Sequence, residues 1–236
     1  MPTTIMAIAA HPGDGFFTMG AAVAQHIHGG GRGVFLSLSL GERGHPTMPP
    51  ADYGALQRTA SEQAAKILGA EAEFLAYPDA EIPFSDESCL AVADRIRQAK
   101  ADIVVTHWSG SWHKDHQNCH AIVRDAMFYA GLPALARTGP EGPLAAHTVT
   151  KLFFAENWED ASGFQTDTYL DVSPVYDRWV EACAKFPMWR GETGFRYNDY
   201  YRSLAVTRGC LGGFQYAVAL ASSSDQRERR LGDFNS

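Results

Sequence analysis

The stretch that decides the fold is Ile5-Met6-Ala7-Ile8-Ala9-Ala10-His11-Pro12-Gly13-Asp14-Gly15, near the beginning of the sequence. It opens with a short apolar run that suits a buried strand, and Pro and Gly end regular structure directly afterwards. From Phe16 to about His28, apolar residues recur at helical spacing, until Gly29-Gly30-Gly31 stops the helix. We therefore predict a buried strand, a polar loop and a helix as the first unit of the fold.

The same alternation continues further along the chain. Strands are predicted over residues 34–38, 73–76 and 103–106, and helices over 53–68, 86–99 and 117–129. Strands that alternate with helices through short connections imply a parallel sheet with right-handed crossovers. The expected fold class is α/β, Rossmann-like, with a mostly parallel sheet and helices on both faces.

The pattern is less regular after residue 129. A Gly- and Pro-rich stretch over 132–143 is expected to be a loop, and the later elements are predicted as strands over 151–155 and 168–172 and helices over 174–185 and 196–211. We expect a flexible tail over about 222–236. Because no internal repeat or domain boundary is evident, residues 1–236 are expected to form one domain.

Composition excludes several classes of protein. The 236 residues carry 20 Lys and Arg against 27 Asp and Glu, a net charge of −7, which disfavours nucleic-acid binding through a general positive field. The four cysteines form no CxxC pair, so neither a thiolate zinc cluster nor a disulfide framework is indicated. No apolar run has the roughly 18–20 residues of a membrane span. We expect a cytoplasmic protein with no nucleic-acid or membrane partner.

Two groups of polar residues follow predicted strands, where parallel sheets bind their ligands. His11-Pro12-Gly13-Asp14 comes after the first strand, and His113-Lys114-Asp115-His116 comes after the fourth. Imidazole and carboxylate are the ligands of a catalytic zinc that keeps one position open. His11, Asp14 and His116 are therefore candidate metal ligands, although either group alone also suits a histidine held by structural hydrogen bonds.

These motifs, with others between them, resemble the LmbE-like or PIG-L family of zinc-dependent N-acetylglucosaminyl deacetylases. The family opens with A-H-P-D-D-E after its first strand, here Ala10-His11-Pro12-Gly13-Asp14-Gly15, and its H-P-D-H motif is similar to His113-Lys114-Asp115-His116. The intervening motifs match in order, as Gly41-Glu42-Arg43-Gly44, Arg58 with Glu62, Ala65-Lys66-Ile67-Leu68-Gly69 and Tyr77-Pro78-Asp79.

The resemblance implies one zinc ion per chain, with His11, Asp14 and His116 as its ligands. It implies catalytic roles for two further residues: His113 would polarise the substrate carbonyl or stabilise the oxyanion, and Asp115 would orient a neighbouring histidine.

Three further residues are expected to meet the substrate. The resemblance implies that Arg58 holds a sugar hydroxyl or an anionic group, and it leaves Glu42 as either structural or substrate-facing. Trp112 flanks the second motif and is expected to form part of a stacking wall or a lid.

The sequence departs from the family at the expected general base. The first aspartate of A-H-P-D-D-E is Gly13 here, and the following glutamate is Gly15. General-base assistance is typically worth about 10²–10⁴-fold. Three explanations are open. Asp115, Asp79 or Glu42 replaces the base, or the substrate brings its own group into the space at Gly13, or the protein binds metal and ligand without turnover.

We therefore expect a zinc-dependent hydrolase that cleaves an N-acyl bond on a small polar, sugar-linked substrate. The alternative is a catalytically impaired, metal-containing binding protein derived from the deacetylases. A nucleotide-binding enzyme without metal is a weaker third reading, because the Gly29–Gly33 stretch precedes a strand and does not join a strand to a helix. The sequence leaves a homo-oligomer open.

Overall fold

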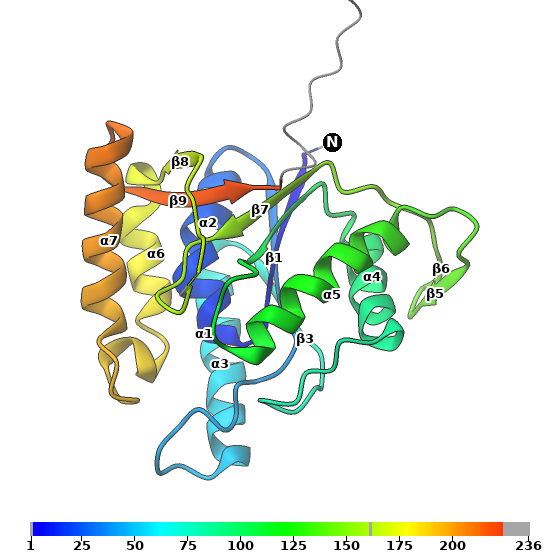
Figure 1. The fold of residues 1–236 in the computed structure, drawn as a ribbon, viewed down its shortest axis with the longest axis horizontal. Helices are drawn as coiled ribbons and strands as arrows, with labels where there is room; N and C mark the ends of the chain where they lie inside the picture. Colours follow the sequence, from blue (N-terminus) through cyan, green and yellow to red (C-terminus); the bar gives the residue numbers. More distant parts are fainter. Residues whose placement is uncertain (1, 161, 224–236) are drawn as a thin grey trace, which may run out of the picture.

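The protein, described here from a computed structural model, is a seven-stranded sheet covered by helices on both faces (Figure 1). The structure describes residues 2–160 and 162–223. The strands are β1 (Thr4–Ala9), β2 (Arg32–Ser37), β3 (Glu71–Phe74), β4 (Ile103–His107), β5 (Arg137–Gly139), β6 (Gly142–Leu144), β7 (Lys151–Ala155), β8 (Thr168–Asp171) and β9 (Ala217–Ser222). The helices are α1 (Pro12–Asp14), π-helix η1 (Gly15–Met19), α2 (Gly20–His28), α3 (Pro50–Leu68), α4 (Asp86–Ala99), α5 (Lys114–Ala130), 3-10 helix η2 (Ser173–Val175), α6 (Tyr176–Cys183), 3-10 helix η3 (Pro187–Arg190) and α7 (Tyr197–Gly212).

The strand order in the sheet is β3-β2-β1-β4-β7-β9-β8. The first five strands in this order pair in parallel, whereas β9 pairs antiparallel with both β7 and β8. The chain therefore crosses from β1 outward through β2 and β3, then returns to add β4 on the other side of β1. This reversal confirms the predicted Rossmann-like class and puts the loops after β1 and β4 next to each other.

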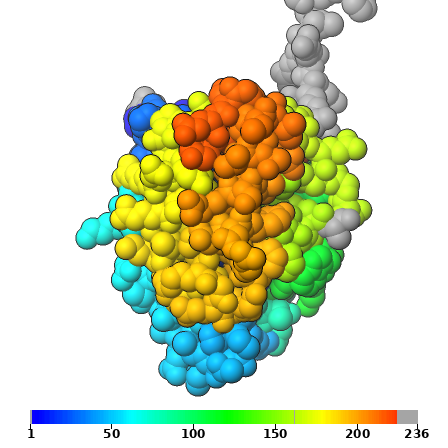
Figure 2. Space-filling view, turned by 90° about the vertical axis from the view of Figure 1, so that its left-hand side faces the viewer, coloured from blue at the N-terminus to red at the C-terminus, as the bar shows by residue number. Residues whose placement is uncertain are grey.

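Alternating residues of the central strands feed two separate cores. On β1, Ile5, Ala7 and Ala9 pack toward η1, α2, α3, α6 and α7, while Met6 and Ile8 pack toward α4 and α5. Every residue of β1 is buried, as expected for a strand covered on both faces. Two of the helices that cover the first of these cores lie side by side on the outer face in Figure 2, α6 in yellow and α7 in orange. No described helix is both long and apolar enough to cross a membrane.

Three sequence predictions are corrected by the structure. The predicted loop over 132–143 contains strand β5 and the start of strand β6, which form an antiparallel hairpin. Strand β9 was not predicted, because its alternation is weak in an Ala-rich segment, and it includes Ser222 from the expected tail. Residues 224–236, the rest of that tail, lie outside the described residues. The helix predicted from 117 already begins at Lys114, which brings Asp115 and His116 into its first turn.

Arg97 ties the hairpin region to the end of α5. Its side chain is 3% exposed, and it donates to the carbonyl oxygens of Ala130 at 3.0 Å and of Tyr129, Leu132 and Leu135 at 2.8 Å each. These carbonyls lie at and beyond the helix C-terminus, where helical partners are missing. The guanidinium therefore adds a second donor to the carbonyl oxygens of Tyr129, Ala130 and Leu132, which already accept from backbone N–H groups, and it donates to Leu135 as well.

We expect Arg97→Leu to lower the free energy of unfolding by at least about 3 kcal/mol, since leucine replaces none of the hydrogen bonds that the buried guanidinium donates to these carbonyl oxygens. The matched control is Arg95→Leu on the same helix. Arg95 is 33% exposed and reaches Glu73 at 3.5 Å, so its loss should cost less than about 1 kcal/mol. Urea unfolding measures both values, and equal losses would contradict the role given to Arg97.

Candidate metal and active site

Polar side chains from four strand-end loops meet above the carboxyl edge of the parallel sheet. His11 and Asp14 follow β1, Asp79 follows β3, His116 begins α5 after β4, and Glu159 follows β7. The short helix α1 starts with Pro12, whose fixed φ and missing N–H suit a first helical position. One turn separates His11 from Asp14, so both face the same point.

His11, Asp14 and His116 form a compact set of nitrogen and oxygen donors. Asp14 Oδ2 lies 3.1 Å from His11 Nδ1 and 3.0 Å from His116 Nε2. The side chain of His116 is 2% exposed, and those of His11 and Asp14 are 14% and 19% exposed. The site is therefore nearly closed on the side of His116 and open to solvent beside Asp14.

Carboxylates hold the outer nitrogens of both imidazoles. His11 Nε2 lies 3.1 Å from Asp79 Oδ1 and 3.4 Å from Asp115 Oδ2. His116 Nδ1 lies 3.0 Å from Glu159 Oε2. Such partners fix the tautomer and ring orientation of a metal-binding histidine and raise its basicity.

The carboxylates also control protonation of the set. Burial alone would lower the pKa of His116, but the Asp14 and Glu159 carboxylates raise it to about 9. For His11, burial also acts to lower the pKa, and the carboxylates of Asp115, Asp14 and Asp79 together raise it well above its usual value. Burial pushes the pKa of Asp14 upward, but the neighbouring histidines hold it well below its usual range. The charges around these imidazoles therefore attract a cation.

The donor set fits a divalent metal. His11, Asp14 and His116 each offer one ligand atom, and these atoms lie within 4.8 Å of one another. Two imidazole nitrogens and one carboxylate oxygen form a ligand set used by catalytic zinc, and the outer carboxylates supply the partners that such ligands need. The cluster predicted from two separate motifs is thus assembled in the fold as a candidate metal centre.

His113 lies beside this cluster with one nitrogen already used. Its ring stacks on His116 at a centroid distance of 4.6 Å and meets His11 edge-on at 5.1 Å. His113 Nδ1 accepts a hydrogen bond from the backbone N of Asp115 at 3.2 Å, which leaves the ring proton of the neutral form on Nε2. Burial, assisted by the charges of His116 and His11, lowers the pKa of His113, which favours this neutral donor.

Trp112 lies at the rim of the site. Its side chain is exposed, at 58%, and its ring approaches His113 at 5.8 Å and Trp158 at 5.9 Å. Trp158 stacks in turn on Phe195 at 4.4 Å. The indole is thus exposed next to the candidate centre, and its contact with a substrate stays a prediction.

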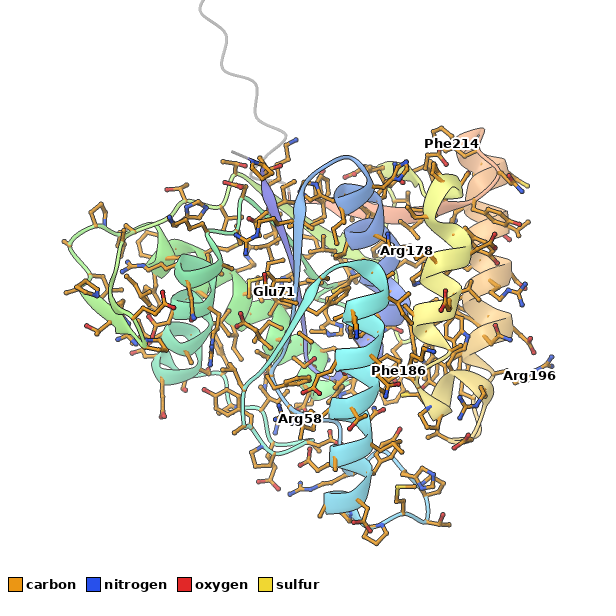
Figure 3. The ribbon with its side chains drawn as sticks, turned by 180° about the vertical axis from the view of Figure 1, so that it is seen from behind. Arg58, Glu71, Arg178, Phe186, Arg196 and Phe214 are labelled. Carbon is orange, nitrogen blue, oxygen red and sulfur yellow. The ribbon has the colours of Figure 1, made fainter. Side chains whose placement is uncertain are left out.

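Arg58 and Glu42, the other two candidate substrate contacts, have partners outside the donor set. Arg58 lies exposed on α3 with its guanidinium 4.3 Å from the ring centre of Phe74 (Figure 3), so the structure does not bring it to the ligand set. Its alkyl and guanidinium groups cover an aromatic ring at the end of β3. Glu42 Oε1 accepts a hydrogen bond from the backbone N of Asp79 at 2.9 Å, which gives Glu42 a structural role in holding that loop.

The three carboxylates considered as replacement bases are all engaged away from Asp14. Asp79 and Asp115 lie at His11 Nε2, on the side of the ring opposite the nitrogen that faces Asp14. Asp115 Oδ2 also accepts from the backbone N of Ala80 at 2.7 Å, and Glu42 holds Asp79. These contacts use one oxygen of Asp115, whereas Asp115 Oδ1 is buried without a hydrogen-bond partner among the described residues, so a base among these three stays a prediction.

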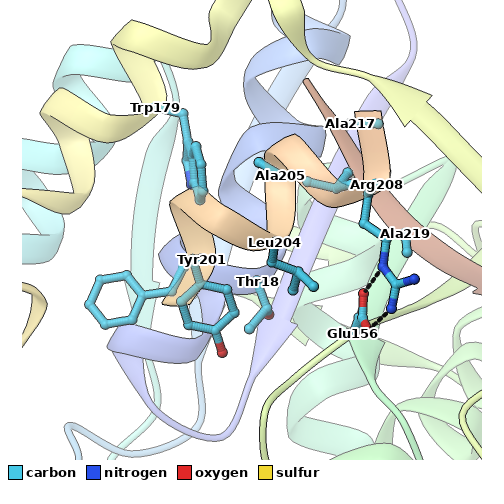
Figure 4. A pocket seen from close by; sticks show the side chains of 11 residues that line it. Thr18, Glu156, Trp179, Tyr201, Leu204, Ala205, Arg208, Ala217 and Ala219 are labelled. Carbon is cyan, nitrogen blue, oxygen red and sulfur yellow. Dashed lines mark hydrogen bonds and ion pairs between the residues drawn. The ribbon is translucent and has the colours of Figure 1, made fainter. Parts of the chain in front are cut away.

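The loop after β7 supplies contacts that the sequence only hinted at through Asn157-Trp158-Glu159-Asp160. Asn157 Nδ2 donates to Asp14 Oδ1 at 3.4 Å, and Tyr201 Oη donates to Asn157 Oδ1 at 2.9 Å. Tyr201 also lines a small cavity of about 20 Å³ behind the site, where Arg208 Nε donates to Glu156 Oε2 at 2.9 Å (Figure 4). Helix α7 thus supports the carboxylate of Asp14 through Tyr201 and Asn157.

The buried carboxyl group of Asp160 is expected to make the free energy of unfolding depend on pH. Burial raises the pKa of this carboxyl to about 7, so the native state holds a proton that the unfolded state releases near pH 4. The stabilisation is complete below about pH 4 and is lost as the pH rises to about 7. As the pH rises from about 4 to about 7, we expect the free energy of unfolding of the wild type to fall relative to that of Asp160→Asn. Urea unfolding at several pH values measures it, and parallel pH profiles would contradict the assignment.

Sequence reasoning missed Met188, which lies beside Gly13 although the two residues are far apart in the sequence. A Cβ atom added at Gly13 would lie 2.9 Å from Met188 Sδ. Tyr53 and Gln57 also contact this sulfur, at 3.7 and 3.6 Å. No motif signal marks Met188, because a methionine in an aromatic-rich segment is typical of a hydrophobic core.

A comparison with known protein families identifies the family of this chain. The PIG-L family, described as GlcNAc-PI de-N-acetylase, matches residues 6–127, just over half of the sequence. The matched segment contains residues 6–9 of β1, all of β4 and all three candidate ligands. The chain belongs to the PIG-L family, and the predicted resemblance is confirmed.

Relatives of known activity fall into two chemical groups. The sequence is 24% identical to 4-oxalmesaconate hydratase of Pseudomonas putida over 86% of this chain and 79% of that protein. It is also 24% identical to diacetylchitobiose deacetylase of Thermococcus kodakarensis over 92% of this chain and 81% of that protein. The fold of a 4-carboxy-2-hydroxymuconate hydratase from Pseudomonas putida matches with a TM-score of 0.84 at 21% identity, covering 98% of this chain and all of that one.

A second structural match comes from a deacetylase. The N,N'-diacetylchitobiose deacetylase of Pyrococcus horikoshii matches with a TM-score of 0.76 at 18% identity, over 94% of this chain and 84% of that one. At these identities the structural matches establish the shared fold alone. An enzymatic activity is in keeping with the family and its named relatives.

Proposed function

We propose that this protein is a zinc-dependent hydrolase that cleaves the N-acyl bond of a small polar, sugar-linked substrate. The observation that carries the proposal is the convergence of His11 Nδ1, Asp14 Oδ2 and His116 Nε2, each backed by further polar partners. These three side chains would hold one zinc ion per chain. When bound, zinc supplies a Lewis acid and lowers the pKa of a coordinated water.

The protein's own residues supply positioning and hydrogen bonding. His113 keeps its ring proton on Nε2 and can donate it to the carbonyl oxygen of a bound acyl group. Asp115 has two positioning roles, because its backbone N fixes His113 and its carboxylate faces His11 Nε2. Trp112 provides an exposed aromatic face at the rim for the sugar-linked part of the substrate.

The charges around the site favour a neutral or cationic substrate. Four carboxylates, those of Asp14, Asp79, Asp115 and Glu159, contact the two ligand imidazoles. The nearby Arg43 is already used, since Nη1 donates to the Asp79 carbonyl oxygen at 2.8 Å and to Glu81 Oε1 at 2.6 Å. N-acyl sugars are neutral and their products are amines, which suits this balance.

A second candidate is a hydratase that adds water to a carbon–carbon double bond. It is favoured by the similarity to 4-oxalmesaconate hydratase and by Gly13, which removes the base expected of a deacetylase. Its weakness is charge, because a substrate rich in carboxylates would meet the acidic surroundings of His11. The two reactions are separated by product, an amine in one case and loss of a conjugated double bond in the other.

The test combines metal analysis with a substrate panel. Purified protein is expected to hold one zinc per chain and to release amine from at least one member of a panel of N-acetylated sugars and glycosides. His11→Ala should lose both properties, while His28→Ala, an exposed histidine at the end of α2, should keep them. Stoichiometric zinc without amine release would refute the hydrolase, and loss of double-bond absorbance would then select the hydratase. Zinc binding with neither reaction would select the binding protein.

The expected partner of the protein is a small-molecule substrate. A cytoplasmic location, the lack of nucleic-acid and membrane partners, and the single domain over residues 1–236 stay predictions of the sequence. Gel filtration with light scattering would decide between a monomer and a homo-oligomer.

A further inference from the structure

The space that a side chain at position 13 would occupy is filled by another part of the chain. Gly13 lies in α1, and it is not among the glycines with positive φ, so its backbone does not require glycine. An added Cβ would lie 2.9 Å from Met188 Sδ and 3.3 Å from Met188 Cε. The thioether of Met188, from η3, therefore closes a space directly beside the ligands His11 and Asp14.

Two buried polar groups face this thioether. Tyr53 Oη lies 3.7 Å from Met188 Sδ and Gln57 Nε2 lies 3.6 Å from it, and both residues come from α3. Tyr53 is 1% exposed and Gln57 is 2% exposed. Among residues 2–160 and 162–223, the acceptor of both donors is this sulfur atom, which accepts hydrogen bonds only weakly.

The other end of the Gln57 amide is also unsatisfied. Gln57 Oε1 is buried and has no hydrogen-bond partner among the described residues. Turning the amide over would only exchange which end lacks a full partner. Buried polar groups without partners cost stability, and a native protein that keeps them has a reason to do so.

We propose that Tyr53, Gln57 and the space under Met188 form a subsite for a hydroxyl group of the substrate, which opens when the Met188 side chain swings aside. The proposal rests on the proposed function only in taking the ligand to be part of the substrate. A hydroxyl in the place of the sulfur accepts from Tyr53 Oη, and its hydrogen goes to Gln57 Oε1 once the amide, whose Nε2 faces the sulfur, is turned over. One group thus gives Tyr53 an oxygen acceptor and gives the amide oxygen a donor.

A hydroxyl fits this subsite better than a carboxylate does. A carboxylate can only accept hydrogen bonds, so it would leave Gln57 Oε1 without a donor and bring a negative charge close to that oxygen atom. Burial, together with the charges of Glu192 and Asp79, raises the pKa of Tyr53 to about 12, so Tyr53 is a neutral donor in an acidic neighbourhood. Both observations select a neutral ligand group.

Met188 is suited to act as a movable cover. Methionine is unbranched and has three rotatable side-chain bonds, so its sulfur and methyl group relocate at low cost. Met188 is only partly buried, in contrast to Trp189 beside it, which is 2% exposed and packs on Phe17. The main chain of η3 can therefore stay in place while the thioether leaves the subsite.

The test follows the methyl group of Met188 by NMR in the metal-loaded protein. The protein has six methionines, and protein labelled with ¹³C-methyl methionine gives a resolved spectrum in which Met188→Leu identifies the resonance. Ethylene glycol, the smallest vicinal diol, is expected to move this resonance saturably. Acetonitrile, which has no hydroxyl, and acetate, which has a carboxylate, are expected to leave it without a saturable shift.

Gln57→Leu and Tyr53→Phe supply the matched variants. Both should lose the saturable response to ethylene glycol, and Gln57→Leu should unfold at the same temperature as wild type or a higher one, because an unsatisfied amide is removed. The proposal is overturned by an unmoved Met188 resonance, by a response to acetate or acetonitrile in place of glycol, or by an unchanged response in Gln57→Leu. The measurement needs no turnover, so it is independent of whether amine is released.

Discussion

His116→Ala is expected to abolish stoichiometric metal binding and to lower amine release by more than about 100-fold, because loss of an outer partner alone costs roughly 10–100-fold. The imidazole of His116 joins α5 to the donor set, with Nε2 at 3.0 Å from Asp14 Oδ2. Alanine leaves two protein ligands and also removes the partner of Glu159. Metal content by atomic emission and amine release together measure the effect.

Glu159→Gln is the graded companion to this variant. It keeps the ligand nitrogen and weakens only the outer contact at 3.0 Å, so metal affinity should fall by about 10–100-fold and not be lost. His28→Ala serves as the surface control. Equal metal content in wild type and His116→Ala would show that the ion is held elsewhere.

Gly13→Asp is expected to raise the KM for the substrate that wild type turns over by about 10-fold or more. The new side chain must displace Met188 and then fills the proposed hydroxyl subsite, where its carboxylate takes the donors of Tyr53 and Gln57. Steady-state kinetics separate KM from kcat. Gly13→Asn, of nearly the same size but unable to act as a base, should show the same increase in KM.

The opposite outcome is equally informative. A rise in kcat of about 10²–10⁴-fold in Gly13→Asp but not in Gly13→Asn would mean that the space at Gly13 serves a general base and that wild type is an impaired deacetylase. Adding Met188→Ala to both variants removes the steric conflict, so a difference between the two pairs would then report only the carboxylate.

Much of the architecture could be predicted because local signals agree with the final fold. Simple sequence rules mark the ends of several elements. Examples are the apolar run before His11, the β-branched segment before His107 and the glycine after α3. The candidate ligands could be predicted as a group because they follow strands that neighbour each other at the reversal of strand order. Metal chemistry restricts the residue types so strongly that short motifs are informative.

The parts that were not predicted depend on contacts between distant segments. Strand β9 is Ala-rich and forms because β7 and β8 offer unpaired edges, a condition absent from its own sequence. The β5–β6 hairpin is a short ladder in a segment that Arg97 holds, and the cover over Gly13 comes from Met188. Arg58 shows the converse, since a motif match predicts a substrate contact for it, whereas the contact that the structure shows is the one with the Phe74 ring.

If the proposed metal binds, the placement of the donor set after β1 and β4 would link the metal supply to the lifetime of the chain. An ion shared by His11, Asp14 and His116 would join the loops of the two neighbouring central strands, and it would bind the native state far better than an unfolded one. By mass action, an ion at 100 times its dissociation constant adds about 2.7 kcal/mol to native stability. Cells short of the metal would therefore hold a larger fraction of unfolded chains, and proteases would degrade these chains.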